Sequence, residues 1–435
     1  MSQIEENTQA FEEPDESTTT LAHPSQEAHD PYKALRFRDF RFLATGTFLN
    51  VLGEQMFTYA IGWELYDRTS SPFALGLVGL LQVIPVFFLT LPAGNVADIF
   101  NRKWIVIIAQ SVVVLSALGL VLLSYTRGSL ILVYGLILLM GVATAFANPS
   151  STAMISQTLP EEVYENAATW HSSSWQLASV VGPALGGMLV ALFHGAVSVY
   201  IANAFLVLLY IVAVFCIRSK QQPVKRSRND TALRSLVEGA RFLTRTQILL
   251  AAITLDMFAV LLGGASTLLP VFAKDILHVG PVELGWLRSA QSIGAICMAL
   301  LLLQRPPFQR AGRTLLLAVI GFGLATIIFG LSHSFWLSLL MLFLLGGLDN
   351  ISVIIRATLL LVRTPDEMRG RVSAINTLFL GASNQLGGFE SGLTAQLFGP
   401  VLSVVGGGLG TVLVVLLVAL FVPELRRLRT LHETP

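Results

Sequence analysis

The stretch GNVADIFNRK, Gly94 to Lys103, joins two long apolar runs and is the most charged short connection in the first half of the chain. A glycine closes the incoming run, Asp98 follows it, and Arg102 with Lys103 open the next run. Each flanking run has about 20 predominantly apolar residues, which is the length at which an α-helix crosses hydrocarbon. The stretch therefore predicts a charged loop at a membrane surface, between two spanning helices.

The same alternation of long apolar runs and short polar connections continues along the chain. Of its 435 residues, 54% are hydrophobic and only 13% are charged, whereas soluble domains carry about 25% charged residues. We predict an all-α polytopic membrane protein with twelve transmembrane helices in two pseudo-symmetric six-helix halves. The predicted spans are 42–66, 74–96, 104–125, 130–155, 167–193, 197–217, 248–272, 284–304, 314–332, 335–361, 372–398 and 401–422.

Polar segments mark the predicted domain boundaries. The first 32 residues hold eight Asp and Glu and no Lys or Arg, a composition typical of a disordered tail. The central connection is basic, and its second part has the spacing of an amphipathic helix on a membrane surface. The predicted parts are an acidic tail 1–34, a first half 35–217, a basic linker 218–247, a second half 248–422 and a tail 423–435.

The two halves resemble each other in sequence, which favours a duplicated transporter with its site between the halves. The pairs with an offset of 209 are Pro72 with Pro281 and Gly76 with Gly285, and those with an offset of 205 are Gly182 with Gly387 and Gly187 with Gly392.

The distribution of Lys and Arg predicts the orientation of the spans. If the N-terminus is cytoplasmic, 23 of these residues lie on the cytoplasmic side and 3 on the other side. Cytoplasmic loops carry the excess of Lys and Arg, so both termini are predicted to be cytoplasmic.

Ionisable residues inside predicted spans are expected to face a wet interior, because a charge in hydrocarbon costs several kcal/mol. Mid-span Glu54, Asp256 and Asp349 are the candidates for proton coupling, since a buried carboxylate can change its charge near neutral pH. The alternative is that each one pairs with a nearby base. Arg288 is a candidate for anion binding or for neutralising Glu54, and Arg356 either lines the cavity or extends toward the cytoplasm.

Amides and aromatic residues gather in spans 4, 5 and 11, at Asn148, Trp175, Gln176 and Asn384. Such a mixture suits an amphiphilic organic ligand, although polar contacts between packed helices would also explain single residues. No nucleotide-binding loop or metal-binding motif occurs. We therefore expect a non-enzymatic monomer without cofactor, metal or nucleic acid, whose partners are the lipid bilayer, a small organic substrate and protons.

The spans, the basic central linker and the stretch Gly94–Lys103 together resemble the major facilitator superfamily. That family has a glycine, an acid four residues later, and basic residues four and five positions after the acid. Gly94, Asp98, Arg102 and Lys103 fill these places. Ile99 stands where an arginine is usual, and Asn101 where a glycine is usual.

A second motif, GPALGG at Gly182–Gly187, resembles the antiporter motif of drug-exporting branches through Gly182, Pro183, Gly186 and Gly187. The arginine that many proton-coupled members carry in span 4 is absent. LRFRDFRFL before span 1 and TPDEMRGRVSAIN before span 11 are similar to the bacterial branch of enterobactin exporters and macrolide efflux proteins.

The resemblance implies proton-driven export of a medium-sized organic molecule, a siderophore or a drug such as a macrolide, by alternating access. The alternatives are a nutrient importer of the same fold and a membrane receptor or scaffold. We further predict a cytoplasmic gate formed by Gly94, Asp98, Arg102, Lys103 and Arg371. In it Asp98 meets Arg369 and Arg371 when the outside is open. The alternative role of this loop is only to fix topology.

Overall fold

The computed structural model describes residue 30 and residues 32–218, 232–306 and 308–428, and these residues form only helices and connections. The predicted tail 1–34 and the first part of the linker therefore lie largely outside the described residues. In the first half the long helices are α1 (Arg38–Thr69), α2 (Pro72–Ile99), α3 (Arg102–Tyr125), α4 (Leu130–Thr158), α5 (Tyr164–Phe193) and α6 (Val197–Phe215), with short η1 (Ala34–Arg36) and η2 (Glu161–Val163).

The remaining described residues form a second series of helices. These are α7 (Ala232–Arg245), α8 (Gln247–Leu262), α9 (Leu269–Val271), the π turn η3 (Phe272–Ile276), α10 (Pro281–Leu303), α11 (Ala311–Leu331), α12 (Phe335–Arg363), α13 (Asp366–Phe398), α14 (Pro400–Phe421) and α15 (Pro423–Arg427). Proline at the first helical position of α2, α10 and α14 lacks the N–H that a helix start leaves unpaired.

Nine helices of the described residues are long and apolar enough to span a membrane, or ten if α7 and α8, bent by 105°, are one span. The predicted number of twelve is therefore not established by length and composition. The long helices α1 and α13 fall outside this set because polar side chains such as Glu54, Gln55 and Gln385 lower their hydropathy.

The predicted span 248–272 does not form a single continuous helix. The run 248–272 breaks after Leu262, and helical structure resumes only at Leu269. Two glycines at the break lower the helix propensity by about 1 kcal/mol each. Gly264 also lies so close to α13 that a Cβ would be 2.0 Å from the Ser391 hydroxyl oxygen. Packing on α13 and the Gly263–Gly264 pair together account for the interruption.

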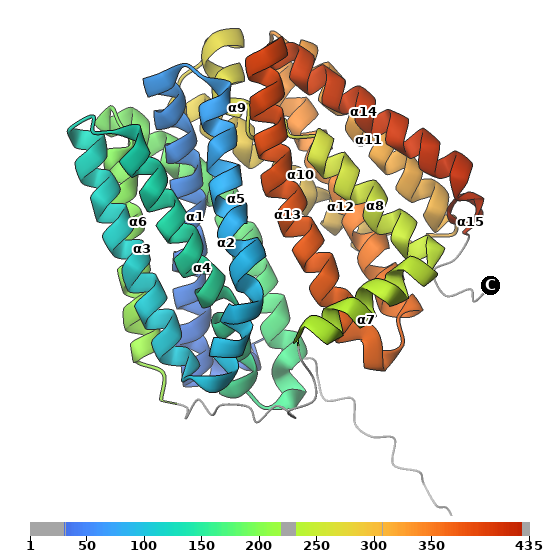
Figure 1. Ribbon diagram of the computed structural model, residues 1–435, viewed down its shortest axis with the longest axis horizontal. Helices are drawn as coiled ribbons and strands as arrows, with labels where there is room; N and C mark the ends of the chain where they lie inside the picture. The colour runs from blue at the N-terminus through green and yellow to red at the C-terminus, as the bar shows by residue number, and fades with distance from the viewer. Residues whose placement is uncertain (1–29, 31, 219–231, 307, 429–435) are drawn as a thin grey trace, which may run out of the picture.

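Helices α1 to α6 pack on one another, and α8 and α10 to α14 form a second bundle. Figure 1 shows the two bundles meeting at the top and diverging toward the bottom. The bottom carries the connections α2–α3, α10–α11 and α12–α13, which we call the arginine-rich end because Arg102, Arg305, Arg369 and Arg371 lie there.

The bundles touch through two crossings at the opposite end, α5 on α10 and α2 on α13. At the first, a Cβ on Gly187 would lie 2.5 Å from the carbonyl oxygen of Pro281. At the second, a Cβ on Gly392 would lie 2.8 Å from the carbonyl oxygen of Pro72. These four residues belong to the sequence repeat, so the repeat corresponds to two equivalent contacts where only glycine allows the backbones to approach.

Polar contacts reinforce the same end. The Lys274 ammonium lies 2.6 Å from the Asp67 carboxylate, and the Tyr66 hydroxyl donates to Asp275. The Ser289 hydroxyl donates to the Val180 carbonyl at 2.6 Å. Toward the arginine-rich end, in contrast, Trp175 of α5 is 48% exposed and Phe88 of α2 is 70% exposed. The structure is thus closed at one end of the bundle pair and open at the other.

Replacing Gly187 by valine is expected to weaken this closure, because the new side chain would overlap the backbone at Pro281. In a Cys216→Ser, Cys297→Ser background, a cysteine introduced by Thr58→Cys would report on access to the interior. We expect its reaction with a membrane-impermeant maleimide, applied at the closed end, to accelerate severalfold in the Gly187→Val protein.

Gly381→Val is the matched control, since a Cβ on the exposed Gly381 meets nothing within 4 Å. It should leave the maleimide rate unchanged. Equal rates in the Gly187→Val and unsubstituted proteins would contradict the role assigned to this crossing.

Candidate functional site

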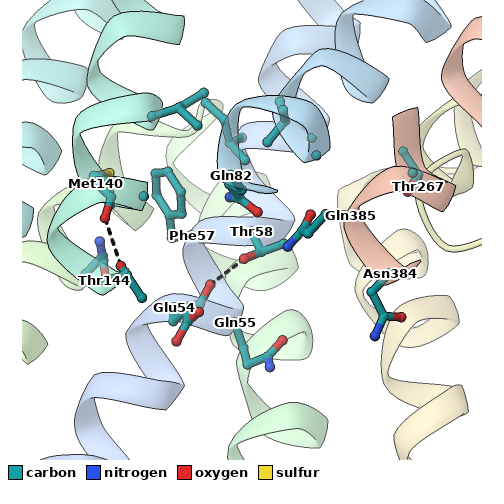
Figure 2. Close-up of a pocket in the computed structure, with 18 of the residues that line it drawn as sticks. Glu54, Gln55, Phe57, Thr58, Gln82, Met140, Thr144, Thr267, Asn384 and Gln385 are labelled. Carbon is teal, nitrogen blue, oxygen red and sulfur yellow. Dashed lines mark hydrogen bonds between the residues drawn. The ribbon is translucent and has the colours of Figure 1, made fainter. Parts of the chain in front are cut away.

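A central cavity of about 480 Å³ lies between the two bundles. Helices α1, α2, α3, α4 and α6 line it from one side, and α10, α13 and the broken segment after α8 line it from the other. Figure 2 shows side chains from both bundles, including Gln82, Thr58 and Gln385, turned toward this space. The eight amide side chains that line it are Asn50, Gln55, Gln82, Gln110, Asn148, Asn203, Asn384 and Gln385.

One face of α1 supplies the first wall of the central cavity. Asn50, Glu54 and Thr58 are four residues apart, so they lie above one another on the helix surface. The adjacent Gly53 packs on α6, where a Cβ would lie 2.7 Å from the Asn203 side-chain oxygen. Close packing of Gly53 on α6 thus turns the neighbouring Glu54 into the cavity, where its side chain stays exposed.

Two charged side chains line the cavity, Glu54 from α1 and Arg288 from α10. The Glu54 carboxylate and the Arg288 guanidinium form no ion pair or hydrogen bond with any described residue. Beside Arg288, the Tyr59 hydroxyl donates to the carbonyl of Pro281. The cavity therefore holds one acid and one base, each left open to interact with a ligand.

Several amides of the wall were not among the residues predicted from the sequence, and two of them lie in apolar runs that hold no ionisable residue. Gln110 of α3 and Asn203 of α6 line the cavity. Both are buried, and one polar atom of each has no hydrogen-bond partner among the described residues. A single amide in each otherwise apolar run was the available signal.

Asp256 and Arg356 lie away from the cavity, buried in the second bundle. Their carboxylate and guanidinium form an ion pair between α8 and α12, with side chains only 5% and 4% exposed. Asp349, also on α12, is half-buried and forms no ion pair or hydrogen bond in the described part of the chain. Of the three proton-coupling candidates, Glu54 is thus the one that lines the central cavity.

The remaining substrate candidates divide into two groups. Asn148 and Asn384 line the central cavity. Trp175 and Gln176 lie on α5 toward the arginine-rich end and are not part of its wall as described. The GPALGG motif takes part in helix packing and does not line the cavity. Gly182 and Gly186 pack on α1, and Gly187 packs on Pro281 of α10.

The gate candidates lie at the arginine-rich end. Asn101, the departure from the family pattern, caps α3 by accepting the Lys103 backbone N–H at 3.0 Å. Arg102 is buried, donates to Ala97 O and lies 3.7 Å from Asp98. The Lys103 ammonium donates to the carbonyl of Phe215 at the end of α6. Gly94 has open space where a Cβ would be.

On the facing bundle, Arg371 of α13 pairs with Glu238 of α7 at 2.5 Å, and Arg369 pairs with Asp366 at 2.7 Å. The arginines expected to meet Asp98 thus pair within their own bundle in this conformation, in which the arginine-rich end is open. The contact with Asp98 stays a prediction for a conformation in which the arginine-rich end is closed. No three His, Cys, Asp or Glu side chains of the described residues come together as metal ligands.

Comparisons with solved structures show the fold. The nucleoside transporter NupG aligns with a TM-score of 0.70 and 15% identity, covering 88% of this chain and 99% of that one. A bacterial homologue of the human lysosomal transporter Spinster, in an inward-facing and unoccupied conformation, aligns with a TM-score of 0.67 and 15% identity, covering 90% and 96% of the two chains.

Curated relatives are similar over almost the whole length. The enterobactin exporter EntS of Citrobacter koseri is 28% identical over 402 residues, which cover 91% of this chain and 94% of the relative. The enterobactin exporter EntS of Shigella boydii serotype 18 is 27% identical with the same coverage.

A family model described as transmembrane secretion effector matches residues 29–433. The match spans both helix bundles and the connection between them, and the relatives, the fold and the apolar helices agree with it. The chain therefore belongs to the transmembrane secretion effector family of the major facilitator superfamily and is a multi-pass inner-membrane transporter of a small substrate.

Proposed function

We propose that this transporter exports a medium-sized amphiphilic organic compound, a siderophore or a drug such as a macrolide, by alternating access coupled to proton entry. The observation that carries the proposal is the central cavity, which is closed at one end and lined by eight amides, Glu54 and Arg288. The description of the family and the export function in the names of the relatives support the direction.

Arg288 is the proposed contact for an acidic group of the substrate. Its guanidinium has no ion-pair partner among the described residues, and a guanidinium binds carboxylate-like oxygens with two parallel hydrogen bonds. The amides supply donors and acceptors for the remaining polar groups, while Phe57, Met140 and Val207 supply apolar surface.

Glu54 is the proposed proton-coupling residue. It lines the same cavity as the proposed substrate contacts, so an ionised Glu54 can accept hydrogen bonds from donor groups of the substrate. Protonation of Glu54 from outside would remove that negative charge and favour substrate release, and loss of the proton to the cytoplasm would restore it. Asp349 is a second candidate because it too is unpaired in the described structure, whereas Asp256 is already paired with Arg356.

A nutrient importer of the same fold is the second candidate. The number of amides in the cavity wall favours it, since amides are typical of sites that bind sugar-like hydroxyl groups. Transport in vesicles of known sidedness separates the two directions.

The substrate and direction are tested by untargeted mass spectrometry of cells and medium from a deletion strain grown under iron limitation. We expect a siderophore to accumulate in the cells and to fall in the medium, with recovery when the gene is restored. Unchanged siderophore secretion together with new macrolide sensitivity would assign drug efflux. If no compound is retained and uptake of a nutrient falls, export is the wrong direction.

Glu54→Gln is expected to abolish the part of substrate transport that depends on a pH gradient, because the amide cannot exchange a proton. Substrate binding at a fixed pH should persist. The measurement is substrate flux in proteoliposomes with and without an imposed pH gradient. A gradient response equal to that of the unsubstituted protein would remove Glu54 from the coupling mechanism.

Asp256→Asn tests whether Asp256, unlike Glu54, stabilises the fold through its ion pair with Arg356. Leaving Arg356 buried without its carboxylate should cost about 3–5 kcal/mol of stability, measured as a lower melting temperature in detergent. Adding Arg356→Met should restore most of that loss. Loss of gradient-driven flux in the stable double variant, with stability regained, would instead support a coupling role for this pair.

The proposed gate closes when Arg371 exchanges Glu238 for Asp98. Asp98→Asn should slow transport about fivefold, since a partly exposed ion pair contributes up to about 1 kcal/mol. Glu238→Gln should release Arg371 for Asp98 and so favour the closed gate. Maleimide applied at the arginine-rich end should then react more slowly with the Thr58→Cys reporter. Normal turnover in Asp98→Asn would leave this loop with the topological role alone.

A further inference from the structure

A second pocket, separate from the central cavity, lies where α8, α13 and α14 meet at the closed end, near the top of Figure 1. We call it the lateral pocket, and it measures about 350 Å³. Its lining includes Glu390 of α13, Leu262 at the end of α8, and Phe398, Leu402 and Gly406 around the α13–α14 turn. The proposed transport cycle uses none of these residues.

The outer rim of the lateral pocket is apolar and faces away from the protein. Phe398 is 65% exposed and Leu402 is 64% exposed. Gly406 is exposed as well, and a Cβ built on it would meet nothing within 4 Å. On helices that cross a bilayer, such a surface faces lipid, so the pocket opens sideways into the leaflet at the closed end.

The polar groups inside the pocket are acceptors of hydrogen bonds. The Glu390 carboxylate receives one long hydrogen bond, from the Ser391 hydroxyl at 3.4 Å, and forms no ion pair with a described residue. The Thr394 and Ser403 hydroxyl oxygens lie 2.7 Å apart, and each also lies within hydrogen-bonding distance of a backbone carbonyl of α13, so both hydroxyl hydrogens have acceptors within the protein. Their remaining lone pairs can only accept.

The interruption of α8 adds partial negative charge to the lateral pocket. Because the helix ends at Leu262, no backbone N–H of the described chain donates to the carbonyls of Val260, Leu261 and Leu262. Unpaired carbonyls at a helix C-terminus act as a partial negative charge. The Leu262 carbonyl lies against Gly407, in the pocket wall, where a Cβ would be 1.9 Å away.

A pocket with one carboxylate, two acceptor hydroxyls and the end of a helix selects a ligand that is positive and rich in donors. A metal ion does not fit, since the pocket is far larger than a coordination shell and provides a single carboxylate. A primary ammonium group has three N–H donors in a compact head. Beyond Gly406, the same face of α14 continues toward the middle of the membrane with exposed Leu409 and Leu413, which can accommodate hydrocarbon chains attached to that head.

The geometry points to a binding site for an aminophospholipid in the lateral pocket, with its primary ammonium on Glu390 and its acyl chains along the exposed face of α14 that continues toward the middle of the membrane, at Leu409 and Leu413. The lipid would neutralise a carboxylate that is otherwise costly in this position. It would also brace α13 against α8 and α14, beside the α2–α13 crossing that closes this end.

The test titrates purified, delipidated full-length protein with short-chain phosphatidylethanolamine, phosphatidylcholine or phosphatidylglycerol, and counts bound lipids by native mass spectrometry. We expect the unsubstituted protein to retain one phosphatidylethanolamine more tightly than either other lipid. Glu390→Gln and Gly406→Leu should weaken that retention by about tenfold or more, the range for losing a hydrogen bond to a charged group.

Two matched variants control for general effects. Gly135→Leu fills another exposed helical glycine with nothing within 4 Å, and Glu165→Gln removes an exposed acid at the arginine-rich end. Both should retain the lipid as the unsubstituted protein does. Equal retention of phosphatidylethanolamine and phosphatidylglycerol, or full retention by Glu390→Gln, would overturn the proposal. Displacement by an equal concentration of free ethanolamine would overturn the assignment to a lipid.

Discussion

The close approach of backbones at two helix crossings is the constraint on which the rest of this structure depends. Gly187 against Pro281 and Gly392 against Pro72 bring the bundles together at one end, with no room for a side chain between them. The central cavity exists because the helices diverge from these contacts toward the other end. Both crossings are as extensive as helix pairs within one bundle, so backbone packing holds this end together along with the polar contacts.

The two bundles contribute differently to the cavity between them. Among the described residues of the wall, the first supplies one acid, Glu54, and most of the amides, while the second supplies one base, Arg288. If the two charges lay within contact distance they would neutralise each other, and a ligand would have to compete with that pair. Two charges that share one polar space without a partner among the described residues cost stability, and this is the physical basis of the roles proposed for them.

The sequence predicted the class of protein, most helix boundaries within about one turn and the repeat, because apolar length and glycine spacing are local properties. It also identified Glu54, Arg288, Asn148 and Asn384, which line the cavity. It could not separate these from Asp256 and Arg356, since an isolated charge in an apolar run does not reveal its partner on another helix. Gln110 and Asn203 were missed because each is a single amide in a run otherwise suited to lipid.

The interruption between Leu262 and Leu269 makes the two bundles mechanically unequal. By the offset of the repeat, Gly263 corresponds to Glu54 on α1, yet α1 is continuous over 32 residues. Helix α1 is therefore continuous, whereas its counterpart in the second bundle is interrupted. Ser266 and Thr267 of the interrupted segment line the central cavity. The duplicated architecture thus places the cavity between two similar bundles, and the loss of symmetry at one position gives only one of its walls an irregular backbone.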